Sequence, residues 1–150
     1  MGLPPGSTVR VPLGKCQRTL ALLWLVASGL LFVLLLVQTS LGHYGDSYAD
    51  AWNWLLPAVL PTASLIVTVL FKTTEAEQKT ADRFLFRLCY GLSLTYLLTL
   101  ILVLLLQPFQ TGAAAEALKH SNIYLGPFQG LVASSIGAFF VQTEKTKAEP

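Results

Sequence analysis

The residues that could hold a metal or a haem are few, and all of them lie in polar segments. His43 is three residues before Asp46, with Asp50 a further turn away, and the second histidine of the chain is His120. A metal site needs ligands at a fixed spacing, and a haem needs axial ligands at the depth of the cofactor. These four side chains meet neither requirement. We expect no metal and no cofactor, and we interpret both histidines as solvated.

A nucleophile is equally hard to find. The stretch Ala133–Gly137, with Ser134 and Ser135 at its centre, resembles an altered G-x-S-x-G elbow. That motif needs a strand before the serine and a histidine to activate it, but this stretch is apolar and distant from both histidines. No phosphate-binding loop, H-E-x-x-H pair or dinucleotide fingerprint occurs. The sequence predicts a chain that is not an enzyme.

Four long apolar runs make up most of the chain around these polar segments. The chain of 150 residues is 53% hydrophobic and only 12% charged, against about 25% charged in a typical soluble domain. Runs of about 20 residues cross a bilayer, and their backbone groups must pair within the segment as helices. We predict an all-α integral membrane protein, a four-transmembrane-helix bundle forming one domain over 1–150. Its spans are expected at about 19–37, 51–71, 84–106 and 123–141.

The first run follows basic residues, as a cleaved signal peptide would. It is longer than the usual apolar core of a signal and lacks an Ala-x-Ala-like site. We therefore interpret it as a retained span. Cys16 precedes it and Cys89 lies near the start of the third span, so the two cysteines indicate neither a disulfide framework nor a ligand cluster. Lipidation of Cys16 is the alternative to an unmodified thiol.

Basic residues set the expected orientation, because positive charge is retained on the cytoplasmic side. Lys119 alone lies between the third and fourth spans. The other nine flank the opposite ends: Arg10, Lys15, Arg18, Lys72, Lys79, Arg83, Arg87, Lys145 and Lys147. We expect both termini and a solvated loop 72–83 in the cytoplasm, and loops 38–50 and 107–122 outside it. The expected location is a bacterial inner membrane. Thr111 is a candidate cap for a short surface helix in the second outer loop.

Small residues recur along the fourth span. Gly126, Gly130 and Ser134 are spaced four apart, Gly137 continues the series, and Gln129 lies beside it. Small residues at this spacing let another helix approach closely. We interpret the series first as a packing seam within the bundle, with assembly onto another helix as the alternative.

The second span carries Pro57, Pro61, Ser64 and Thr68 on one helix face. Each proline removes a backbone donor, so Pro61 frees the carbonyl of Pro57, which needs a partner in hydrocarbon. We predict a kinked second helix with this face toward the bundle interior, where it would form a polar path. On the third span, Cys89, Ser93 and Tyr96 form a related seam. The first span, mostly Leu and Val, is expected to face lipid.

The spans contain no Asp, Glu, His or Lys, which disfavours proton-coupled transport. Arg87 is close enough to the third span's start to snorkel to the headgroups. Without a chemical site, the expected function is that of an accessory or interaction subunit, with the lipid bilayer and other membrane helices as partners. The net charge of +2 disfavours nucleic acid. The alternative is a homo-oligomeric channel or membrane-permeabilising pore, whose path would use hydroxyls and freed carbonyls. An intramembrane redox subunit ranks last.

Overall fold

Four long helices make up almost all of the computed structural model, which describes residues 10–72, 80–109 and 114–145. They are α1 (Leu13–Ser40), α2 (Tyr48–Lys72), α3 (Arg83–Leu106) and α4 (Ala114–Lys145). Each contains one of the predicted spans, and each is long and apolar enough to cross a membrane. The prediction of a helical protein with four candidate membrane spans is confirmed.

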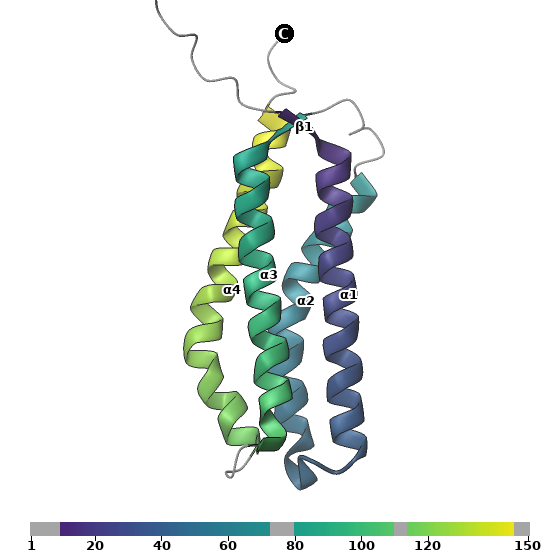
Figure 1. Cartoon of the computed structure of the whole chain (residues 1–150), viewed down its shortest axis with the longest axis vertical. Coiled ribbons are helices and arrows are strands. Elements are labelled where there is room, and N and C mark those ends of the chain that lie inside the picture. Colours follow the sequence, from purple (N-terminus) through teal and green to yellow (C-terminus); the bar gives the residue numbers. More distant parts are fainter. Residues whose placement is uncertain (1–9, 73–79, 110–113, 146–150) are drawn as a thin grey trace, which may run out of the picture.

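The helices pack in an order that differs from their order in the chain. α1 packs mainly against α2 and α3, and α4 packs mainly against the same two helices. The consecutive helices α2 and α3 therefore lie across a diagonal of the bundle. As a result α1 and α3, which run in the same direction, are neighbours, and so are the parallel helices α2 and α4 (Figure 1).

A short pair of strands joins the two halves of the chain at one end of the bundle. β1 (Arg10–Pro12) is antiparallel to β2 (Thr80–Asp82), with Val11 opposite Ala81. Each strand runs directly into a helix, β1 into α1 and β2 into α3. Asp82 also caps α3, because its carboxylate accepts a hydrogen bond of 2.9 Å from the backbone N–H of Phe84. We call this the strand end of the bundle; α4 also finishes there (Figure 1).

The strand pair corrects the expectation that loop 72–83 is only a solvated connector. Residues 80–82 of that loop pair with the N-terminal segment instead. Three-residue strands leave no periodic signal in a sequence, so this pairing was not predictable from hydrophobic pattern.

α4 begins well before its apolar run, at Ala114. Thr111 lies outside the residues that the structure describes, but the expected separate surface helix is wrong for 114–122, which are continuous with α4. The reason is an inward stripe at helical spacing, formed by the buried residues Leu118, Ser121 and Leu125. This stripe packs the polar first turns of α4 onto the bundle.

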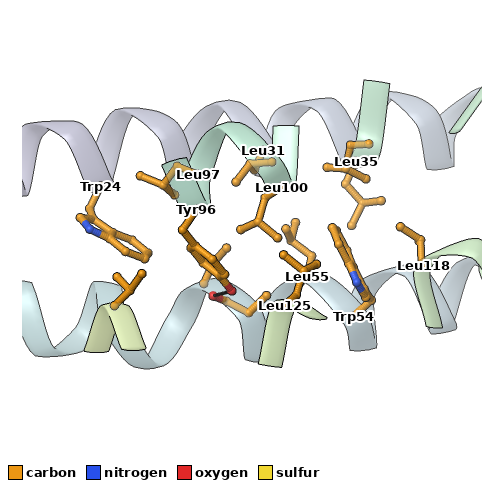
Figure 2. Close-up of a cluster of buried hydrophobic side chains, with 14 of the residues drawn as sticks. Trp24, Leu31, Leu35, Trp54, Leu55, Tyr96, Leu97, Leu100, Leu118 and Leu125 are labelled. Atoms are coloured by element: carbon orange, nitrogen blue, oxygen red, sulfur yellow. Dashed lines mark hydrogen bonds between the residues drawn. The ribbon is translucent and has the colours of Figure 1, made fainter. Parts of the chain in front are cut away.

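Aromatic side chains cross the centre of the bundle (Figure 2). Trp24 of α1 and Tyr96 of α3 are fully buried and stack with ring centroids 6.1 Å apart. The Tyr96 hydroxyl then donates a 3.0 Å hydrogen bond to the carbonyl of Ala58 on α2, across the diagonal. Beyond this pair, away from the strand end, buried leucines fill the interior: Leu31, Leu35, Leu55, Leu100, Leu104, Leu118 and Leu125.

A second polar contact closes the opposite end. The Gln38 amide donates to the carbonyl of Leu104 at 2.9 Å, and its oxygen accepts from the Tyr44 hydroxyl at 2.8 Å. Tyr44 thereby ties the turn between α1 and α2 to α1 and α3. Burial raises the pKa of Tyr44 to about 12.

Replacing Tyr44 with Phe should change how stability depends on pH. The unfolded chain loses the tyrosine proton near pH 10, whereas the folded chain keeps it until about pH 12. The contribution to stability is therefore full below pH 10 and is lost as the pH rises toward 12, at about 1.4 kcal/mol per pH unit. Thermal unfolding of purified protein between pH 9 and 12 should show a smaller alkaline loss for Tyr44→Phe than for the wild type. Equal slopes would contradict the assignment.

The strand register predicts a specific disulfide. Residues directly opposite in an antiparallel pair have Cα atoms about 4.5–5.5 Å apart, within disulfide range. With Cys16 and Cys89 changed to Ala, the double variant Val11→Cys, Ala81→Cys should form a disulfide on oxidation, detected by mass spectrometry of linked peptides. The matched control is Val11→Cys, Asp82→Cys, in which the two side chains project to opposite faces. Equal cross-linking of both pairs would refute the register.

Candidate functional site

The small residues of α4 lie on the outside of the bundle. Gly126, Gly130 and Ser134, which we call the glycine stripe, are exposed, and Gly137 is half-buried. A Cβ built on Gly126, Gly130 or Gly137 would meet no atom within 4 Å. The inward face of α4 instead carries large side chains, namely Leu125, Val132, Ile136 and Phe139. The first interpretation, a packing seam within the bundle, is therefore wrong for the glycine stripe, since none of the described helices covers it.

The polar face of α2 also points outward. Pro57, Pro61, Ser64 and Thr68, which we call the proline stripe, are all exposed. The prediction that this face lines the bundle interior is wrong. Aromatic and aliphatic side chains occupy the inward face of α2: Trp54, Leu55, Ala58, Val59 and Ile66. Among its hydroxyls, Thr68 donates to the carbonyl of Ser64 on the same helix at 2.8 Å.

The two stripes flank the contact between α2 and α4. Trp54 faces α4, since its indole N–H donates to Ser121 at 2.9 Å. Pro57 and Pro61 follow at three and seven residues, on the same side of α2. On α4, Gln129 faces α2 and sits between Gly126 and Gly130. The stripes therefore form one surface, the α2–α4 outer face.

A hydrogen bond joins the stripes directly. The Gln129 amide N–H donates to the carbonyl of Pro57 at 2.8 Å. This is the carbonyl that Pro61 leaves without its helical donor. The sequence indicated both a glutamine in need of a partner and a carbonyl in need of a donor, and the structure brings them together.

Two further polar contacts extend this joint toward the end opposite the strands. The Trp54–Ser121 bond is buried, and the Ser121 hydroxyl in turn donates to the carbonyl of Leu118 at 2.7 Å. Nearer the end, the Lys119 ammonium lies 3.0 Å from the Asp50 carboxylate, on the surface. Sequence reasoning missed both contacts. The signal for the first was Trp54 itself, since a buried indole N–H usually finds an acceptor.

The remaining candidate residues are not assembled into a chemical site. His43 and His120 are exposed, and the described parts of the chain contain no group of three or more His, Cys, Asp or Glu residues placed to hold a metal. Ser135 lies within α4, and its hydroxyl donates to the carbonyl of Val132 at 2.8 Å. Cys16 and Cys89 are buried free thiols in one cluster at the strand end. Cys89 donates to the carbonyl of Ser135 at 3.0 Å.

Removing the Gln129 amide should destabilise the α2–α4 joint. In Gln129→Leu, the carbonyl of Pro57 loses its donor, and interhelical hydrogen bonds in membrane proteins are worth about 0.6–1.7 kcal/mol. Reversible unfolding in detergent should show a loss of this size. Ser134→Ala, on the glycine stripe of the same helix, is the control and should be neutral. If Gln129→Leu were as stable as the wild type, the bond would carry no weight in the fold.

The α2–α4 outer face thus combines open glycines, two prolines with constrained backbone, and a hydrogen-bonded joint that fixes the two helices relative to each other. Such a surface presents backbone rather than reactive groups, which suits contact with another helix better than catalysis. Comparisons with protein-family models, with curated proteins and with solved structures found no match for this chain.

Proposed function

We propose that this chain is a multi-pass protein of a bacterial inner membrane, with both termini in the cytoplasm. The distribution of basic residues supports this orientation. α1, α3 and the end of α4 meet at the strand end, and the sequence positions of nine of the ten Lys and Arg residues lie there or in the adjoining segments. Lys119 is at the other end. The strand pair would then face the cytoplasm.

The protein would act without catalysis, as an accessory or interaction subunit that docks onto another membrane helix through the α2–α4 outer face. The observation that carries this proposal is the openness of the glycine stripe. Association in lipid depends on close packing, because lipid tails are as apolar as the helices. A partner helix can approach the backbone of α4 at Gly126 and Gly130, where no other described part of the chain intervenes.

The outer surface of α1 offers a contrast. It exposes large apolar side chains such as Leu22, Val26 and Val33. Lipid tails solvate such a surface well, and branched side chains keep another backbone at a distance. Gly29 is an isolated exposed glycine on that surface, so α1 carries no stripe of glycines at four-residue spacing. The chain therefore has one outer face suited to helix docking and one suited to lipid.

The alternative is a homo-oligomeric channel or pore. Among the described residues, buried leucines fill the interior of the single bundle between Tyr96 and the end opposite the strands, which disfavours a polar route there. Ser64, Thr68 and Ser134 lie outside it, so a polar path would have to run between copies that meet at the α2–α4 outer face. This alternative uses the same surface with a second copy as partner.

The test compares two exposed glycines, Gly130 on the α2–α4 outer face and Gly29 on the outer surface of α1. Gly130→Leu and Gly29→Leu make the same chemical change in mid-helix, and both sites have open space around them. A photo-cross-linking residue at position 134 should give a discrete protein adduct in native membranes. Gly130→Leu should reduce that adduct about tenfold, the equivalent of 1.4 kcal/mol, whereas Gly29→Leu should leave it unchanged.

Differently tagged copies and a membrane-potential assay separate the two functions. An adduct with a different protein and intact membranes supports the accessory subunit. An adduct between copies, together with a leak that Gly130→Leu abolishes, overturns it in favour of the pore. A diffuse, lipid-only adduct at position 134, equal to one at position 33 on α1, would overturn docking at this face altogether.

A further inference from the structure

Several buried polar side chains among the described residues lack a hydrogen-bond partner, and three of them lie on different helices near the centre of the bundle. Trp24, Thr62 and Ser93 are 0%, 2% and 0% exposed. The indole N–H of Trp24 and both hydroxyl oxygens are buried without a partner. Other hydroxyls in these helices, including those of Thr39 and Thr95, bond back to a carbonyl one turn earlier. The hydroxyls of Thr62 and Ser93 make no such hydrogen bond, although burying a hydroxyl without a partner is costly.

These groups come from three different helices but lie at one level. Tyr96 and Ala58 mark a common depth, since they are hydrogen-bonded. Ser93 is one turn from Tyr96 along α3, and Thr62 is one turn from Ala58 along α2, both toward the strand end. Trp24 stacks on Tyr96 from α1, on that same side (Figure 2). Side chains this completely buried must project into the bundle, so the three polar groups converge.

We propose that Trp24, Thr62 and Ser93 form an internal binding site for water. The indole N–H can only donate, whereas each hydroxyl can donate and accept. One or two water molecules supply the acceptor that the indole needs and bridge the hydroxyls, which a typical buried water does with about three hydrogen bonds. The three side chains themselves carry no charge, which favours a neutral occupant over an ion. The leucines beyond Tyr96 separate the site from the opposite end.

Hydroxyl deletion tests the proposal through the sign of the effect. In the full chain in detergent, Thr62→Val and Ser93→Ala should each lower the unfolding temperature by about 2–4 °C, the usual response of a domain of this size to one lost interaction. The double variant should lose less than the sum, because both hydroxyls hold the same water. Thr95→Val, on the outer side of α3, is the matched control. The proposal would be overturned if each single variant were as stable as the wild type or more stable, and if the two effects added in the double variant. In a site without water, removing a buried unpartnered hydroxyl stabilises the fold.

The indole proton gives a direct readout. The NMR signal of this proton is assigned by its disappearance in Trp24→Phe. In the wild type it should show a cross-peak to long-lived water, and this cross-peak should be lost in the double variant Thr62→Val, Ser93→Ala. An absent cross-peak in a wild type that is folded, as judged by the other indole signals, would overturn the site. This result does not depend on what docks at the α2–α4 outer face.

Discussion

The centre of this bundle is filled by large side chains, and their bulk governs the placement of almost everything else. Trp24 and Tyr96 stack between α1 and α3, and the Tyr96 hydroxyl reaches α2 across the diagonal. Rings of this size hold the helices apart at that level. A glycine facing such an interior would leave space that large side chains fill better. Gly126 and Gly130 are on the outside instead, together with the prolines of α2.

The same constraint explains which predictions the sequence could support. Helix number and extent follow from run length, because a bilayer demands about 20 apolar residues per span. Which face of each helix points into the bundle does not follow from the sequence. Both the inner and the outer surface of a membrane helix are apolar, so the hydrophobic periodicity of the sequence is weak. Gly130 and Pro61 were assigned inward on the strength of small size and a freed carbonyl. The structure shows that Trp54, Leu125 and Val132 took those inward positions instead.

The sequence showed which polar groups needed a hydrogen-bond partner, but not which group would be that partner. The carbonyl of Pro57 had to be satisfied and Gln129 had to find an acceptor, and both needs followed from residue type alone. Their meeting at 2.8 Å required the arrangement in which α2 and α4 are parallel neighbours. That arrangement is not readable from the sequence, since short connections would sooner suggest that consecutive helices pack side by side. The strand pair could not be predicted either, because its two short segments lie in different halves of the chain.

The joint between α2 and α4 also gives the outer face its rigidity. One hydrogen bond, one buried indole contact and one ion pair hold the two helices in register along their shared length. Glycines and prolines have no side-chain rotamers to immobilise, and a fixed pair of helices has little relative motion to lose. Both properties lower the entropic cost of docking.

The strand pair has a consequence for biosynthesis. β1 precedes the first helix, but its partner β2 is not translated until both helices of the first half have been synthesised. At about 5–20 residues per second, that interval lasts several seconds. During that interval β1 has no strand to pair with. If the helices span a membrane as we propose, α1 and α2 would enter it before the contact that aligns α1 with α3 can form. In the proposed topology the two halves would thus be joined late and outside the hydrocarbon, after the first half has been inserted.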